Sequence, residues 1–119
     1  MMRTKLNSWL RRTVMHGAMD LALQATEVNA YCYDGQDGRR RLNADVADAS
    51  EAVHTARDLT PAWAHPDLDR ALRHIDTAMT GDDVDSRLYA MLDAAAALRR
   101  AHQSLLVRCA DYRAQEITP

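Results

Sequence analysis

The C-terminal part of the chain contains one continuous apolar seam, and this seam constrains the fold more than any other feature. Its residues recur at alternating intervals of four and three positions, which aligns them on one face of an α-helix. The seam consists of Val84, Leu88, Met91, Ala95, Leu98, His102, Leu105, Cys109 and Tyr112. A helix of this length buries such a face against other helices, so the seam predicts an all-α protein.

The rest of the chain shows the same periodicity, interrupted by turn-forming residues. The apolar face of the first expected helix consists of Leu6, Leu10, Val14, Ala18, Leu21, Ala25, Val28 and Cys32. Asp-Gly pairs at 34–35 and 37–38, Thr60-Pro61, His65-Pro66 and Gly81 interrupt the helical pattern. Asn43 and either Asp82 or Asp83 suit N-cap positions. The expected helices are Thr4–Tyr33, Asn43–Leu59, Pro66–Thr80, and Asp82 or Asp83 to Gln115.

Short connections between successive helices make neighbouring helices antiparallel. With 119 residues, 47% of them hydrophobic, the chain has the size and apolar content of a single domain covering residues 1–119. Alanine, the best helix former, is the commonest residue, and no segment alternates as a β-strand does. The sequence therefore predicts an up-down-up-down four-helix bundle with long first and last helices.

Charge and cysteine content restrict the class of protein. The formal net charge is −2, without the basic excess typical of nucleic-acid-binding proteins, so we expect no nucleic-acid partner. Cys32 and Cys109 should lie about 30 Å apart in such a bundle, so we expect no disulfide between them and a cytoplasmic location. No apolar run approaches the ~18 residues of a membrane span, and the N-terminus lacks the apolar core of a signal peptide. The alanine- and arginine-rich composition is typical of a GC-rich genome, such as that of an actinobacterium or its phage.

One candidate metal motif is Glu51-x-x-His54, which has the ligand spacing of di-iron helical bundles. Those sites need a second such motif and two further glutamates in the core. The only other glutamates are Glu27 and Glu116, and neither is followed by a histidine three positions later. We therefore interpret Glu51 and His54 as surface residues and expect neither a metal nor a cofactor.

Two acidic groups, Asp45/Asp48/Glu51 and Asp82/Asp85, resemble the magnesium-binding carboxylates of the all-helical nucleotide pyrophosphohydrolases. The chain lacks the Glu-Glu-x-x-Glu pattern of that family. Both groups lie near expected helix N-termini, where carboxylates are stabilised by the helix dipole. Capping of the helices is the better interpretation.

Arg11-x4-His16 resembles the loose Arg-x4-6-His signature of the HEPN ribonucleases, which are all-helical and of similar length. The resemblance implies that Arg11 would hold a phosphate group while His16 transfers a proton, with His102 as a further candidate. In that family the motif begins a C-terminal helix, whereas here it lies in the first helix.

His102 occupies a seam position where an apolar side chain is expected. A buried imidazole without a hydrogen-bond partner costs about 1–3 kcal/mol, so His102 should have a partner. It is either a satisfied core or edge histidine or a ligand-contacting residue. His65, in a connection expected at a similar level, is the candidate neighbour.

The expected helix lengths predict a self-association surface. The two long helices should project beyond the two short ones and expose apolar residues, which usually mark an interface. This interface should consist of Leu6, Trp9, Leu10, Leu105, Leu106, Cys109 and Tyr112, with Trp9 and Leu105 near its centre. Pairing about a two-fold axis predicts a homodimer, and a helical protein partner is the other possibility.

The first twelve residues are basic and amphipathic, with Arg3, Lys5, Arg11 and Arg12 around apolar residues. Such a segment is compatible with an acidic partner or a membrane surface. The sequence shows no nucleophile–base pair, phosphate loop or metal cluster, so we assign no catalytic residue. It favours a non-enzymatic protein–protein interaction or regulatory protein. The alternative is an all-helical, HEPN-like nuclease or hydrolase.

Overall fold

The computed structural model describes residues 2–28 and 33–117, with side chains described for residues 10–28 and 33–108. In this part of the chain there are four α-helices, one short 3-10 helix and no β-strand. These elements are α1 (Met2–Thr26), α2 (Gly35–Leu59), η2 (Ala62–Ala64), α3 (His65–Thr80) and α4 (Val84–Ile117). The predicted all-α class is confirmed. None of the described helices is long and apolar enough to cross a membrane.

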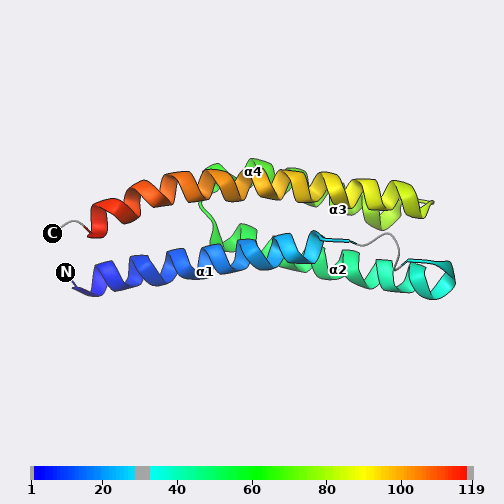
Figure 1. Ribbon diagram of the computed structural model, residues 1–119, viewed down its shortest axis with the longest axis horizontal. Helices are drawn as coiled ribbons and strands as arrows, with labels where there is room; N and C mark the ends of the chain where they lie inside the picture. Colours follow the sequence, from blue (N-terminus) through cyan, green and yellow to red (C-terminus); the bar gives the residue numbers. More distant parts are fainter. Residues whose placement is uncertain (1, 29–32, 118–119) are drawn as a thin grey trace.

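The helices form an elongated molecule measuring 59 × 21 × 20 Å (Figure 1). α3 packs most extensively on α4, and α1 packs on α2; contacts of α2 with α3 and of α1 with α4 close the ring. Figure 1 shows the start of α1 and the end of α4 at the same end of the molecule. Both extend beyond the turn that joins α2 to α3, as the sequence predicts for the first and last helices.

The core between the helices is rich in alanine, which allows the helix backbones to approach closely. Its larger members are each fully buried: Met19, Leu42, Val46, Val53, Leu68, Ile75, Met91, Leu98 and Leu105. The predicted seam of α4 is buried from Leu88 to Leu105, except for the half-buried His102. Burial of this seam against α3 and α1 accounts for the stability of the long α4 helix.

The buried face of α1 differs from the predicted one. Met15, Ala18, Met19 and Ala22 lie in the core. Among the described residues of the predicted seam, Ala18 is buried, Ala25 and Val28 are partly buried against the core, and Leu10, Val14 and Leu21 are exposed. This correction has a physical reason: α1 has apolar residues on two faces, and the flexible methionines and small alanines fit closely against alanine-rich neighbours.

The connection between α1 and α2 also differs from the prediction. α1 ends at Thr26 rather than at Tyr33, and the Thr26 hydroxyl donates to the carbonyl oxygen of Leu23 (2.8 Å). α2 begins at Gly35 rather than at Asn43. Gly35 has a φ of +68°, which reverses the chain, and the Gly38 N–H donates to the Asp34 carbonyl oxygen (3.0 Å). The Asp-Gly segment that the sequence predicted as a turn therefore forms the first turn of α2. As a result α1 and α2 have the same length, 25 residues each.

The other two connections follow the predicted turn chemistry. Pro66 lies in the first turn of α3, where its missing N–H costs nothing. The Gly81 N–H donates to the Thr77 carbonyl oxygen (3.0 Å) at the end of that helix. At the start of α4, Asp83 accepts hydrogen bonds from the backbone N–H (3.2 Å) and the hydroxyl (2.5 Å) of Ser86. These bonds lower the pKa of Asp83 below its ordinary value, and they identify Asp83 as the capping residue.

Candidate functional site

A groove of about 740 Å³ lies along the outer faces of α1 and α2. We call it the α1/α2 groove. Most of its floor is apolar, because α1 and α2 each present small or aliphatic side chains there. It is lined by Val14, Gly17, Ala18, Asp20, Leu21, Asp48, Glu51, Ala52, Thr55 and Leu59. The size and lining of the groove are those of a surface that can receive another polypeptide segment.

The apolar wall contributed by α1 is the part of its predicted seam that turned outward. Leu10, which lies on the same face but does not line the groove, is 45% exposed, whereas the groove-lining Val14 is 52% exposed and Leu21 64%. Gly17 lies between the last two on the same face, and an added Cβ there would meet nothing within 4 Å. Exposure of aliphatic side chains to water is unfavourable, so this row is an apolar surface that burial against another element would stabilise.

Three carboxylates form the edges of the α1/α2 groove. Asp20 is contributed by α1, and Asp48 and Glu51 are contributed by α2; all three are exposed. None of the groove-lining residues is basic. The groove therefore combines an apolar floor with a negatively charged rim, a combination that favours a segment with apolar side chains and basic flanks.

Asp20 also belongs to a polar cluster between α1 and α4. The rings of His16 and His102 meet edge to face, with their centroids 6.0 Å apart. The His102 Nε2 atom lies 3.6 Å from an Asp20 carboxylate oxygen. These two residues of α1 are the polar neighbours of His102, and the cluster lies between α1 and α4.

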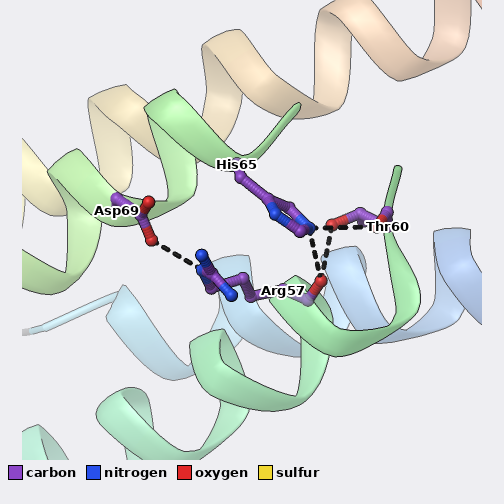
Figure 2. Close-up of polar contacts among 4 residues, drawn as sticks. All are labelled: Arg57, Thr60, His65 and Asp69. Atoms are coloured by element: carbon purple, nitrogen blue, oxygen red, sulfur yellow. Dashed lines mark hydrogen bonds and ion pairs between the residues drawn. The ribbon is translucent and has the colours of Figure 1, made fainter. Parts of the chain in front are cut away.

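His65 has different neighbours, which close the turn between α2 and α3 (Figure 2). Its Nε2 atom lies 2.9 Å from the Arg57 carbonyl oxygen and 3.1 Å from that of Thr60. Because both oxygens are acceptors, Nε2 carries the hydrogen and donates. The prediction that His65 lies beside His102 is therefore not supported by the contacts of either residue. His65 instead stabilises the turn between α2 and α3 through its two hydrogen bonds.

An ion pair lies beside this histidine and joins α2 to α3. The Arg57 Nε donates to an Asp69 carboxylate oxygen at 2.7 Å (Figure 2). This hydrogen bond is the main reason why the pKa of Asp69 is lowered and the pKa of Arg57 is raised from their ordinary values. The Arg57 side chain is 37% exposed and the Asp69 side chain 41%, so solvent screens the attraction between them.

The two residues of the HEPN-like motif occupy different faces of α1. Arg11 is exposed, whereas His16 is half-buried against α4. Five residues along an α-helix correspond to a rotation of about 140°, so the two side chains diverge. The structure brings His16 to His102, but it does not bring Arg11 to either of them.

The acidic motifs of the sequence serve several separate purposes. Asp45 accepts a hydrogen bond from the Tyr33 hydroxyl (2.6 Å), while Asp48 and Glu51 edge the groove. Glu51 and His54 are both exposed on α2. Across the described residues, no group of three or more histidine, cysteine or acidic side chains has a geometry that could hold a metal ion.

The predicted self-association residues differ in their placement. Leu10 and Leu106 are about half exposed, but Leu105 is fully buried in the core of its own chain. The side chains of Leu6, Trp9, Cys109 and Tyr112 lie outside the described residues, and so does Cys32. The exposed apolar surface that the structure describes near α1 is therefore centred on Val14 and Leu21.

Sequence reasoning missed one buried charged residue. Arg87 of α4 is 7% exposed; its Nε donates to the Ala78 carbonyl oxygen (2.5 Å), and a terminal guanidinium nitrogen donates to the side-chain oxygen of Asn43. It thereby links α2, α3 and α4. No sequence signal distinguishes Arg87 from the exposed arginines, because its partners lie on other helices.

Comparison with known proteins gives no relative: the chain matches no protein-family model, and no curated protein or solved structure is significantly similar to it. The geometry of the α1/α2 groove is therefore the basis for a functional proposal.

Proposed function

We propose that this chain is a non-enzymatic protein–protein interaction protein that binds a helical partner in the α1/α2 groove. One observation supports this proposal above the others. Val14 and Leu21, which belong to the seam expected to bury α1 in its own core, point outward instead, with Leu21 64% exposed. A second element laid on this face would remove the exposed side chains from water, at roughly 25 cal/mol for each Å² of apolar surface buried.

The chemistry of the groove supports a helical partner in particular. The floor is formed by side chains that recur with helical spacing on α1 and α2, and the exposed carboxylates lie at its edges. An amphipathic helix presents an apolar strip with polar flanks, so it matches this arrangement when the flanks are basic. Such recognition needs no catalytic residue in the groove.

We also propose that the scaffold is the antiparallel, up-down-up-down bundle expected from the short connections. The common end shared by the start of α1 and the end of α4 supports this arrangement (Figure 1). In such a scaffold α1 and α2 are backed by α3 and α4, so the groove is presented on a rigid surface. Preorganisation of this kind reduces the entropic cost of binding.

The alternative is a HEPN-like nuclease, and the approach of His16 to His102 is the observation that favours it. The position of Arg11 on another face leaves this pair without the phosphate-holding group that the motif implies. An RNA-cleavage assay distinguishes the two functions. A nuclease would lose activity in both His16→Ala and His102→Ala, whereas the interaction protein has no such activity to lose.

The proposed function is tested by site-directed photo-cross-linking in an extract of the native host. A photoreactive amino acid at Leu21 should give a discrete adduct, which mass spectrometry identifies as a second copy or another protein. The same group at Asp76, an exposed residue of α3, is the matched control and should give none. Equal labelling from both positions, or no adduct from Leu21, would contradict the proposal.

A further inference from the structure

The outward face of α1 has a sequence pattern that is complementary to itself. Leu10, Val14, Gly17 and Leu21 are spaced by four, three and four residues, and all four are exposed. This spacing reads the same in both directions along the helix. Two such helices can therefore pair in an antiparallel manner so that every position of the row meets another position of the row.

We propose that the occupant of the α1/α2 groove is α1 of a second copy of this chain, lying antiparallel to the first. The two-fold axis passes between Val14 and Gly17. Leu10 then lies opposite Leu21 of the second copy, and Val14 lies opposite Gly17 of the second copy. This proposal rests on the proposed function, since it identifies the partner of the same groove.

Gly17 gives this register its shape complementarity. A Cβ atom at Gly17 would have open space around it, so the outer face of α1 has a depression at that position. Val14, three residues earlier, is the projecting side chain. The two-fold axis places Val14 of each helix over Gly17 of the other, so each valine side chain fills the space left by a glycine.

The distribution of charge favours the antiparallel direction. Residues 2–12 contain the basic residues Arg3, Lys5, Arg11 and Arg12 and no acidic residue. Residues 13–28 contain Asp20 and Glu27 and no lysine or arginine, and Asp48 and Glu51 of α2 line the same groove. An antiparallel pair places the basic half of each α1 helix over the acidic half of the other. A parallel pair would place like charges together, which is unfavourable.

Disulfide cross-linking tests both the occupant and its direction. In a background with Cys32 and Cys109 replaced by serine, Leu10→Cys and Leu21→Cys are made separately, each at an exposed position that tolerates substitution. Mixing the two variants under mild oxidation should give a cross-linked dimer. Each variant alone should stay uncross-linked, because in the proposed register identical positions are about 16 Å apart along the helix axis, beyond the ~7 Å limit for a disulfide.

The possible outcomes are distinct. Self-linking of Leu10→Cys alone would show a parallel pair, and absence of a link in the mixture would show that a second copy does not occupy the groove. Thiol titration of both variants in denaturant confirms that the cysteines are reactive. If the mixture gives no link while the photoreactive group at Leu21 labels a different protein, this inference is overturned and the proposed function stands. If Leu21 labels nothing, both fail.

Discussion

The backbone of Gly38 lies so close to the backbone of Tyr33 that a Cβ atom at residue 38 would overlap the Tyr33 carbonyl carbon. This contact lets the chain turn tightly into α2. The Tyr33 side chain is buried, and its hydroxyl donates a hydrogen bond to the carboxylate of Asp45, which belongs to α2. The close approach therefore fixes the start of α2 and, through it, the position of the acidic side chains that edge the α1/α2 groove.

Gly38→Ala should destabilise the protein by about 2–3 kcal/mol, because the clash is with backbone atoms that cannot move aside without shifting the helix. Gln36→Ala, at an exposed position in the same first turn of α2, is the matched control. It changes a side chain that lies in solvent, so the free energy of unfolding should change by less than about 0.5 kcal/mol. Urea denaturation followed by circular dichroism measures both changes. Equal effects of the two substitutions would show that the Tyr33–Gly38 contact is absent.

The sequence predicted α4 well and α1 poorly, for a physical reason. In α4 the seam keeps its four-and-three spacing along the whole packed length of the helix, so periodicity identifies what is buried from Leu88 to Leu105, although Leu92 and Val107 on other faces are exposed. In α1 two faces are apolar, and the choice between Met15/Met19 and Val14/Leu21 depends on which one fits the neighbouring helices. Local patterns do not contain that information, so the groove could not be predicted.

The limits of local patterns also explain the other differences. Asp-Gly pairs favour turns, and the turn does occur, but the packing of Gly38 against Tyr33 converts its second half into helix. The role of Arg87 depends on acceptors in α2 and α3, which are distant in sequence. The His16–His102 contact likewise joins residues from opposite ends of the chain.

Arg87→Ala should destabilise the bundle by about 2–4 kcal/mol, because it removes a buried side chain and leaves the Ala78 carbonyl oxygen without its donor. Arg99→Ala, at an exposed position of the same helix, should change stability by less than about 0.5 kcal/mol. A double-mutant cycle with Asn43→Ala should give a coupling energy of about 1 kcal/mol. If Arg87→Ala costs no more than Arg99→Ala, the proposed link between three helices is wrong.

The Arg57–Asp69 pair predicts a specific acid sensitivity. The pKa of Asp69 is lower in the folded chain than its ordinary value of 3.8. The ionised carboxylate therefore stabilises the fold fully at any pH above this ordinary value. This contribution is lost as the pH falls through the lowered folded-state pKa. The melting temperature of Asp69→Asn should therefore lie below that of the wild type at neutral pH, and the two should converge once the pH falls below the lowered pKa of Asp69.

Asp76→Asn, at an exposed position of the same helix, serves as the control for this pH dependence. Its melting temperature should follow that of the wild type throughout the titration. Because the Arg57–Asp69 pair is partly exposed, high salt should reduce the difference between Asp69→Asn and the wild type. A difference that stays constant from neutral to acidic pH would contradict the assigned role of Asp69.

Multi-angle light scattering at micromolar concentration tests whether the outward face of α1 is a dimer interface. The wild type should have twice the 13.4 kDa mass of the chain. Leu21→Glu should be a folded monomer, whereas Leu92→Glu, at a similarly exposed site on α4 (52%), should remain a dimer. A wild-type mass of 13.4 kDa, or dissociation by Leu92→Glu but not by Leu21→Glu, would show that this face of α1 is not the dimer interface.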